Sequence, residues 1–589
     1  MKYIQYTGLG IFLIALFAFI TILFTSSFQI TEANIPQIKD QLKENHREYV
    51  IEEITKLKGQ TYGKFSFISK ISQAIKASNT KISAQYGLSG EEIETYTNIA
   101  VVEGENGYTV TQASYDEANQ LLGEEMKETV LAYSSWLIGQ SAGSEDELKE
   151  KVRNGIKGAV DGYVNNFKIF DSDQEEYQFS IAKITASGFY WDHKYEFFLF
   201  IIVFGSIGAL IWIFPAFYDG MPGIKHNHIY HSSAMSRGAI GIAAGVFLIL
   251  FYILLYYKHF YIAEWVALAD PVSRWLRNGA DADRWFMYGF LYTIAIIVMG
   301  IRMFTKYRHS KYHLIRTSSV MFFQLAFAFI IPQILYNLRL PSMDLKNMWP
   351  LDYSFFFDYR LDEFTSTQIG VWMMVWGIAL FVLGVPIITY FYGKRWYCSW
   401  VCGCGGLAET LGDPYRQLSS KKLIAWQIER YLIHGVLVFA VVMTIAVLYT
   451  YFTSSSNFLG INSYTIRWIY GLLIGGIFAG VVGTGFYPLM GNRVWCRFGC
   501  PLAAYLGLVQ RFKSRFRITT NGGQCISCGN CSTYCEMGID VRWYAQRGQN
   551  IVRSSCVGCG VCAAVCPRGV LALENGPDDG ESRMGEVGE

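Results

Sequence analysis

Long apolar runs separated by short polar connections occupy most of this chain. Eight runs of about twenty apolar residues are long enough to cross, as helices, a hydrocarbon core about 30 Å thick. Only the first connection is long, and it comprises residues 30–194. The pattern therefore predicts an α-helical polytopic membrane protein, with spans near 8–28, 195–217, 238–258, 286–305, 319–336, 370–392, 431–452 and 467–490.

The long connection is patterned differently from the spans. Residues 37–59 and 143–167 place charged residues at helical spacing on one face, which predicts amphipathic helices. We expect a mostly helical domain over 30–194, with some strand near 177–191. The first apolar run lacks a small-residue cleavage site, so residues 1–29 are predicted to remain as a membrane anchor.

Lysine and arginine are distributed unequally between the two sets of connections. Segments 302–316, 394–430 and 493–517 are basic, whereas 453–466 contains neither residue. The positive-inside rule then places both termini in the cytoplasm and residues 30–194 outside a cell inner membrane. Loop 259–285 opposes this assignment, because it carries Arg274, Arg277 and Arg284 on the outer side.

The overall composition agrees with a membrane protein. Of 589 residues, 52% are hydrophobic and only 17% are charged, against about 25% in soluble domains. The formal net charge of +2 gives no polybasic surface, so no nucleic-acid partner is expected. Membrane lipid is an expected partner, through the basic residues Arg511, Lys513, Arg515 and Arg517.

All 13 cysteines lie between Cys398 and Cys566, and the last eight form two copies of C-x2-C-x2-C-x3-C. This is the bacterial run that binds two [4Fe–4S] clusters, in which each fourth cysteine serves the other cluster. Zinc knuckles and disulfides are the alternatives, and neither matches this spacing as well. We predict a two-cluster ferredoxin domain of α+β type over 518–575, followed by a disordered tail at 576–589. The ligands would be Cys525, Cys528, Cys531 and Cys566 for cluster one, and Cys556, Cys559, Cys562 and Cys535 for cluster two.

A second cysteine pattern recurs within the membrane segment 370–517, which follows another membrane segment at 195–369. The motif G-x-R-x-x-C-x-x-x-C gives Cys398 and Cys402, then Cys496 and Cys500 exactly 98 residues later. An i, i+4 spacing would place each pair on one helical face, and the two pairs could meet as four thiolates. A third iron–sulfur centre, another metal site such as zinc, redox-active dithiols and buried apolar cysteines all remain open. Cys404 has no counterpart in the second copy.

Histidines offer weaker candidates. His226, His228 and His231 lie together in one loop, without an Asp, Glu or Cys at ligand spacing, so a solvated loop is favoured over a metal site. His434 is the only histidine within a predicted span, and without a partner at matched depth it does not predict haem b. A quinone contact at His434 remains open.

The paired CxxxC motifs and the doubled ferredoxin run together resemble the NosR/NirI/NapH family of membrane-bound polyferredoxins, over residues 195–575. The resemblance implies a membrane core that exchanges electrons with extracytoplasmic reductases or supports their maturation. Two features depart from the family pattern. Gly403 stands where the family has proline, and residues 30–194 lack the S-G-A-T-like flavin motif, so FMN is not expected.

These observations predict a membrane-bound iron–sulfur electron-transfer protein. Its electrons would pass between a cytoplasmic donor or the quinone pool and a membrane or extracytoplasmic redox partner. An assembly factor for a metallo-oxidoreductase and a redox-sensing regulator are the alternatives. We expect an electron-carrying oxidoreductase component, within a larger complex or alone, and no catalytic residue is assigned.

Overall fold

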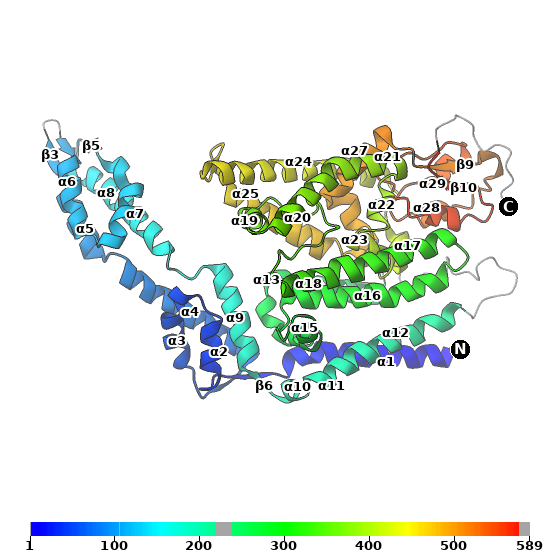
Figure 1. Ribbon diagram of the computed structural model, residues 1–589, viewed down its shortest axis with the longest axis horizontal. Coiled ribbons are helices and arrows are strands. Elements are labelled where there is room, and N and C mark those ends of the chain that lie inside the picture. The colour runs from blue at the N-terminus through cyan, green and yellow to red at the C-terminus, as the bar shows by residue number, and fades with distance from the viewer. Residues whose placement is uncertain (1, 105–106, 218–237, 577–589) are drawn as a thin grey trace. The chain divides into compact units, whose positions relative to one another are not determined.

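The computed structural model describes residues 2–104, 107–217 and 238–576 (Figure 1). The histidine loop and the predicted tail beyond residue 576 lie outside these ranges. The chain forms two compact units. We call them the membrane unit (Met1–Ile20, Lys194–Tyr257 and Trp265–Glu589) and the helical unit (Thr21–His193 and Lys258–Glu264).

The helical unit is built mainly of helices around a core of aliphatic and aromatic side chains. Two small three-stranded antiparallel sheets complete it, in the orders β2–β1–β6 and β3–β4–β5. The strands are β1 Ser27–Gln29, β2 Thr61–Gly63, β3 Val102–Gly104, β4 Gly107–Thr109, β5 Ser141–Ala142 and β6 Ala186–Ser187. The helices are α2 Asn34–Asp40, α3 Glu44–Thr55, α4 Lys64–Tyr86, α5 Gly90–Ala100, α6 Gln112–Ala118, α7 Glu124–Ser134, α8 Glu145–Asn165 and α9 Asp171–Thr185.

The strand expected over 177–191 is mostly wrong. Helix α9 continues to Thr185, and only Ala186–Ser187 forms a strand, paired with β1. The reason lies in the burial pattern, because Gln178, Ile181, Ala182 and Thr185 are buried at helical spacing.

The short segment Lys258–Glu264 belongs to the helical unit although it is distant in sequence. Glu264 is fully buried and pairs with Lys64 of α4 at 2.8 Å. Its carbonyl oxygen accepts a hydrogen bond from the Tyr190 hydroxyl at 2.8 Å. Lys258–Glu264 and residues 21–193 therefore form one compact unit.

The membrane unit contains, within the described residues, eight helices that are long and apolar enough to cross a membrane. Their number agrees with the prediction. The fifth begins at Lys311, earlier than predicted, because its polar first turns contact the C-terminal domain instead of ending the helix. The spans are Tyr3–Phe24, Lys194–Ile213, Ala239–Tyr257, Arg284–Lys306, Lys311–Asn337, Gln368–Tyr392, Leu423–Thr453 and Ser463–Val482.

Helix α1 (Lys2–Thr21) lies beside α12 (Gly205–Ile213), as Figure 1 shows. The two backbones approach closely at glycines, since a Cβ on Gly208 would lie 2.7 Å from the Phe12 nitrogen. The first residues of α1 lie at the end of the bundle that carries β9 and β10 (Figure 1). Both the N-terminal residues and the C-terminal domain are therefore at the same end of the membrane unit.

The C-terminal domain comprises residues 517–576 and has a two-stranded antiparallel sheet, β9 (Arg517–Thr520) with β10 (Leu571–Glu574). Its helices are short: α28 Asn530–Thr533, α29 Val541–Gln546 and α30 Val561–Ala564. One hydrophobic cluster contains buried residues of this domain together with Cys398, Cys402, Cys496 and Cys500. The domain is thus part of the membrane unit's core and not an appendage on a linker.

Candidate redox site

The two cysteine loops of the C-terminal domain share one backbone conformation. Ser527 and Gly529 have positive φ angles of 58° and 80°, and Gly558 and Gly560 have 61° and 80° at the equivalent positions. Left-handed residues in such loops turn successive N–H groups toward a common point, which favours anionic groups. Both loops are therefore shaped as cradles for negatively charged centres.

The first cysteine set comprises Cys525, Cys528, Cys531 and Cys566. These residues line one small cavity of about 20 Å³, together with Arg542 and Pro567. Burial, together with the nearby Cys566, Cys528 and Cys525, raises the pKa of Cys531 to about 11. The structure therefore brings together the four residues predicted for cluster one, including the distant fourth cysteine.

The second cysteine set comprises Cys535, Cys556, Cys559 and Cys562. Burial raises the pKa of Cys562 well above its usual value, and the other three members of the set add to this effect. The two fourth cysteines have matching environments, because the N–H groups of Ile539 and Val570 each approach a sulfur, of Cys535 and Cys566 respectively, at 3.4 Å. The crossed arrangement and its hydrogen bonds to sulfur suit a pair of cubane clusters.

The repeated CxxxC motifs do not lie on continuous helices, so the expectation of one helical face is wrong. Cys398 ends α22 (Arg395–Cys398), and Cys402 precedes α23 (Gly403–Glu409). In each copy the backbone N–H of the second cysteine donates to the carbonyl oxygen five residues earlier. Cys402 donates to Tyr397 at 2.8 Å, and Cys500 donates to Trp495 at 2.9 Å. The turn follows a left-handed glycine, Gly393 or Gly491, which redirects the chain at the end of the preceding helix.

The four thiols of these turns, which we call the CxxxC group, are buried close to one another. Burial raises the pKa of Cys398 to about 12, and Cys496 and Cys402 contribute in the same direction. Cys404 also lies here, and a hydrogen bond from its thiol lowers the pKa of Cys402 to about 6. Thiolates of this kind are soft ligands that iron–sulfur clusters and zinc prefer, but no three His, Cys, Asp or Glu side chains among the described residues are spaced to hold a single metal ion.

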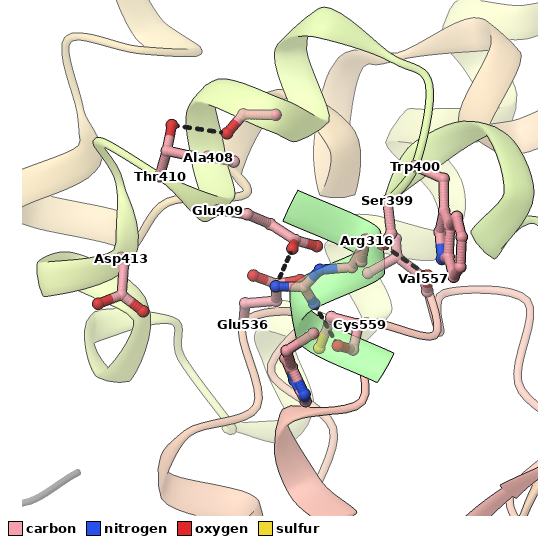
Figure 2. A network of polar contacts seen from close by, with 12 residues as sticks. Arg316, Ser399, Trp400, Ala408, Glu409, Thr410, Asp413, Glu536, Val557 and Cys559 are labelled. Carbon is pink, nitrogen blue, oxygen red and sulfur yellow. Dashed lines mark hydrogen bonds and ion pairs between the residues drawn. The ribbon is translucent and has the colours of Figure 1, made fainter. Parts of the chain in front are cut away.

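A buried network of charged side chains connects the CxxxC group with the second cysteine set. Figure 2 shows its members Arg316, Glu409 and Glu536 beside Cys559. Arg316 of α17 (Lys311–Phe322) pairs with Glu409 at 2.6 Å and also donates to the Cys559 carbonyl. Arg493 pairs with Glu409 at 2.5 Å and with Glu536 at 3.1 Å. Because buried charges require partners, this network fixes α17, α23 and both cysteine regions relative to one another.

Glu536 occupies the centre of this network, directly after Cys535. Its carboxylate binds Arg416 at 2.7 Å as well as Arg493. Arg416 Nη1 approaches Cys559 Sγ at 3.9 Å, and Arg493 Nη1 approaches Cys496 Sγ at 3.7 Å. Burial alone would raise the pKa of Glu536, but the two guanidinium groups outweigh it and lower the pKa to about 2. One ionised carboxylate therefore bridges two arginines that touch different cysteine centres.

Asp413 forms a second anchor beside this bridge. It accepts contacts from Arg302 at 2.6 Å and Lys306 at 2.7 Å, both from α16 (Arg284–Lys306), and from Arg416 at 3.3 Å. Burial opposes ionisation, yet these three cations hold the pKa of Asp413 well below its usual range. The network thus contains more cationic than anionic groups, which offsets the negative charge of thiolate-ligated clusters.

Neutral hydrogen bonds dock the second cysteine loop onto the first CxxxC turn and onto helices α17 and α27 (Pro501–Lys513). Ser399 donates to the Val557 carbonyl at 2.9 Å, as Figure 2 shows. Tyr312 donates to the Gly558 carbonyl at 2.7 Å, and Gln510 donates to the Cys556 carbonyl at 2.9 Å. Since the contacted groups are backbone carbonyls, the loop is held in position independently of its side chains.

Sequence reasoning missed the members of this network. One indication of Arg493 was present in the sequence, because it is the arginine of the second copy of the G-x-R-x-x-C motif, equivalent to Arg395 in the first copy. Glu536 could have been suspected from its place next to Cys535. Arg316 and Glu409 gave no signal, since their pairing depends on two segments that approach each other only in the folded chain.

Comparisons with known proteins agree with this chemistry. The family described as a 4Fe-4S dicluster domain matches residues 513–570. A family described as a 4Fe-4S binding domain matches residues 374–423 and again 471–519, which are the two copies of the CxxxC repeat. No solved structure matches the chain.

Among curated proteins, the chain is similar to the "Putative electron transport protein YccM" of Escherichia coli strain K12. The two are 27% identical over 194 residues, which is 30% of this chain and 51% of that protein. The chain therefore spans about half the length of this curated relative. Together with the family matches, this likeness identifies the chain as an iron–sulfur protein that carries 4Fe-4S domains related to electron transport.

Proposed function

We propose that this protein carries electrons between the two clusters of its C-terminal domain and a third iron–sulfur centre held by the CxxxC group. The observation that carries the proposal is the Arg416–Glu536–Arg493 bridge, whose two arginines each approach a sulfur of a different centre. Such a shared buried bridge suits two centres that must keep a fixed separation and compatible potentials.

Each cluster would be held by a set of cysteines that the fold gathers. Cys525, Cys528, Cys531 and Cys566 would hold cluster one, and Cys535, Cys556, Cys559 and Cys562 would hold cluster two. The third centre would use Cys398, Cys402, Cys496 and Cys500. When bound, each cluster supplies one-electron chemistry, and the protein supplies donors to sulfur, exclusion of water and compensating charge.

Burial gives this route a direction through the molecule. Cys528 of the first set is exposed, whereas Cys556 and Cys562 of the second set and the whole CxxxC group are buried. A soluble redox protein could therefore exchange electrons at cluster one, with cluster two and the third centre following toward the membrane helices. A membrane redox partner or the quinone pool would be the other terminus, and an extracytoplasmic reductase of the kind served by the NosR/NirI/NapH family is the partner class we favour.

The proposed orientation keeps the C-terminal domain in the cytoplasm of a cell inner membrane and residues 30–193 outside. It is supported by the common end shared by the start of α1 and the C-terminal domain (Figure 1). The basic loop 259–285 counts against this orientation, because the positive-inside rule counts Arg274 and Arg277 even though they pair with Asp281 at 2.7 Å and Asp283 at 2.5 Å.

Iron quantification with EPR spectroscopy on the purified full chain tests the proposal. Three cubane clusters correspond to about twelve irons per chain, and two clusters to about eight. We expect Cys398→Ser and Cys496→Ser each to lower the iron content from about twelve to about eight and to remove one EPR signal. Cys404→Ser is the matched control, because it replaces a neighbouring thiol that lies outside the proposed ligand set. An iron content of about eight in the unmodified protein, unchanged by either substitution, would refute the third centre.

A further inference from the structure

A polar cavity of about 270 Å³ lies beside the CxxxC group. Its walls come from the first turns of α24 (Leu423–Thr453), from α27 (Pro501–Lys513) and from residues 552–555 of the C-terminal domain. Cys496 also lines it. The cavity therefore lies where a membrane helix begins and the iron–sulfur domain is attached.

The charged residues that line this cavity are almost all cationic. The single acidic residue, Glu429, is already paired with Arg497 at 2.7 Å. The other four cations form no ion pair with any described residue. Two of them lie over the Trp426 ring, with Arg430 at 5.1 Å and Arg553 at 5.2 Å from the ring centroid. The uncompensated cations are Lys394, Arg430, Arg511 and Arg553.

Lys394 is the strongest indication of a ligand. Only 1% of this residue is exposed, and its backbone N–H donates to Gln510 at 2.7 Å. Its ammonium group has no hydrogen-bond or ion-pair partner among the described residues, although it lies in the cavity wall. An ammonium group that has no partner and faces a cavity lined by other cations is stabilised by a bound anion.

We infer that this cavity binds a phosphate-bearing anion. A phosphate group offers several acceptor oxygens and one or two negative charges, which match a lysine and the forked donors of several arginines. The volume exceeds that of a single small ion. The neighbouring start of α24 exposes the large apolar residues Ile424 and Tyr431, by 62% and 71%, as expected where a helix meets the lipid boundary.

Two sources could supply this phosphate, an acidic phospholipid headgroup or a soluble phosphate compound. Basic pockets between membrane helices commonly bind acidic headgroups. The full chain should therefore be purified in nonionic detergent and its bound phosphorus measured, with the lipids identified by mass spectrometry. Delipidated protein should then be titrated with inorganic pyrophosphate, and in parallel with phosphatidylglycerol in nanodiscs of phosphatidylcholine.

Retained phosphatidylglycerol or cardiolipin would identify a headgroup, and pyrophosphate binding in delipidated protein would identify a soluble source. We expect Arg511→Gln to weaken binding about tenfold, as for loss of one charge-assisted hydrogen bond, and Lys394→Met to weaken it more. Arg511 is exposed, so its variant tests the inference even if Lys394→Met does not fold. Arg515→Gln is the control, since Arg515 is a neighbouring exposed arginine outside the cavity.

Two results would overturn the inference. One is the absence of both retained phosphorus and measurable binding of either probe. The other is phosphorus content and affinity that stay the same in Arg511→Gln and Lys394→Met as in Arg515→Gln. In that second case Lys394 would serve only the neighbouring Cys398 and Cys556, whose thiolates it stabilises. Because all these measurements report phosphate binding, they are independent of whether the CxxxC group holds a cluster.

Discussion

Replacing Glu536 by glutamine tests directly whether the buried bridge controls both redox centres. The substitution keeps the size of the side chain and removes one negative charge. Arg416 and Arg493 would then be less compensated, next to Cys559 Sγ and Cys496 Sγ. Since an added electron is stabilised by positive charge, the midpoint potentials of cluster two and of the proposed third centre should both rise.

The size of the shift follows from two contacts of one atom. Arg416 Nη1 lies 2.7 Å from the Glu536 carboxylate and 3.9 Å from Cys559 Sγ, so the carboxylate is within about 7 Å of the sulfur. At an effective dielectric constant of about 20, one charge at about 7 Å changes the energy by about 2 kcal/mol, or about 100 mV for one electron. Because the electron is spread over the cluster beyond the sulfur, we expect a rise of about 50–100 mV.

Potentiometric titration followed by EPR provides the assay, with iron content measured on the same samples. Glu536→Asp keeps the charge and should leave the potentials near those of the unmodified protein, and Glu574→Gln on β10 is a control outside the bridge. A change below about 20 mV at both centres in Glu536→Gln, with full iron content, would refute the argument. A shift at cluster two alone would show that Arg493 does not connect Glu536 to the CxxxC group.

Three further predictions concern other parts of the chain. In iron quantification, Gly405→Ala should lower the iron content by about four of about twelve irons, because the new Cβ would lie 1.9 Å from the Cys398 carbonyl oxygen. Gly435→Ala is the control and should keep the full iron content, because no atom lies within 4 Å of the Cβ at that position. Glu264→Ala should destabilise the helical unit by about 3 kcal/mol in proteolysis-monitored urea unfolding, since it leaves Lys64 buried and unpaired; an unchanged midpoint would contradict this. Burial lowers the pKa of His46 from its usual value of 6.5, so the unfolded chain binds protons more readily than the folded chain. The free energy of unfolding of the helical unit should therefore decrease as the pH falls from about 7.5 to about 5.5. His46→Gln should remove this pH dependence.

The sequence was most informative where the chemistry is local. Three cysteines within seven residues and spans of continuous apolar residues are recognisable without tertiary structure. The CxxxC turns were misjudged because the i, i+4 spacing suggested one continuous helix, whereas α22 ends at Cys398 and the helical turn Trp495–Gly499 ends before Cys500. The charged network could not be predicted, because Arg316 and Glu536 are 220 positions apart and only the packing of the folded chain places them in the same network.

The shared core of the C-terminal domain and the CxxxC group has a kinetic consequence. Carriers tethered by flexible linkers must diffuse between donor and acceptor, so their rates depend on solvent viscosity and linker length. Here backbone carbonyls of the second cysteine loop are bonded to Ser399, Tyr312 and Gln510, so no such search is needed. Electron exchange between these centres should be insensitive to added glycerol, and a soluble ferredoxin supplied separately should not replace the domain.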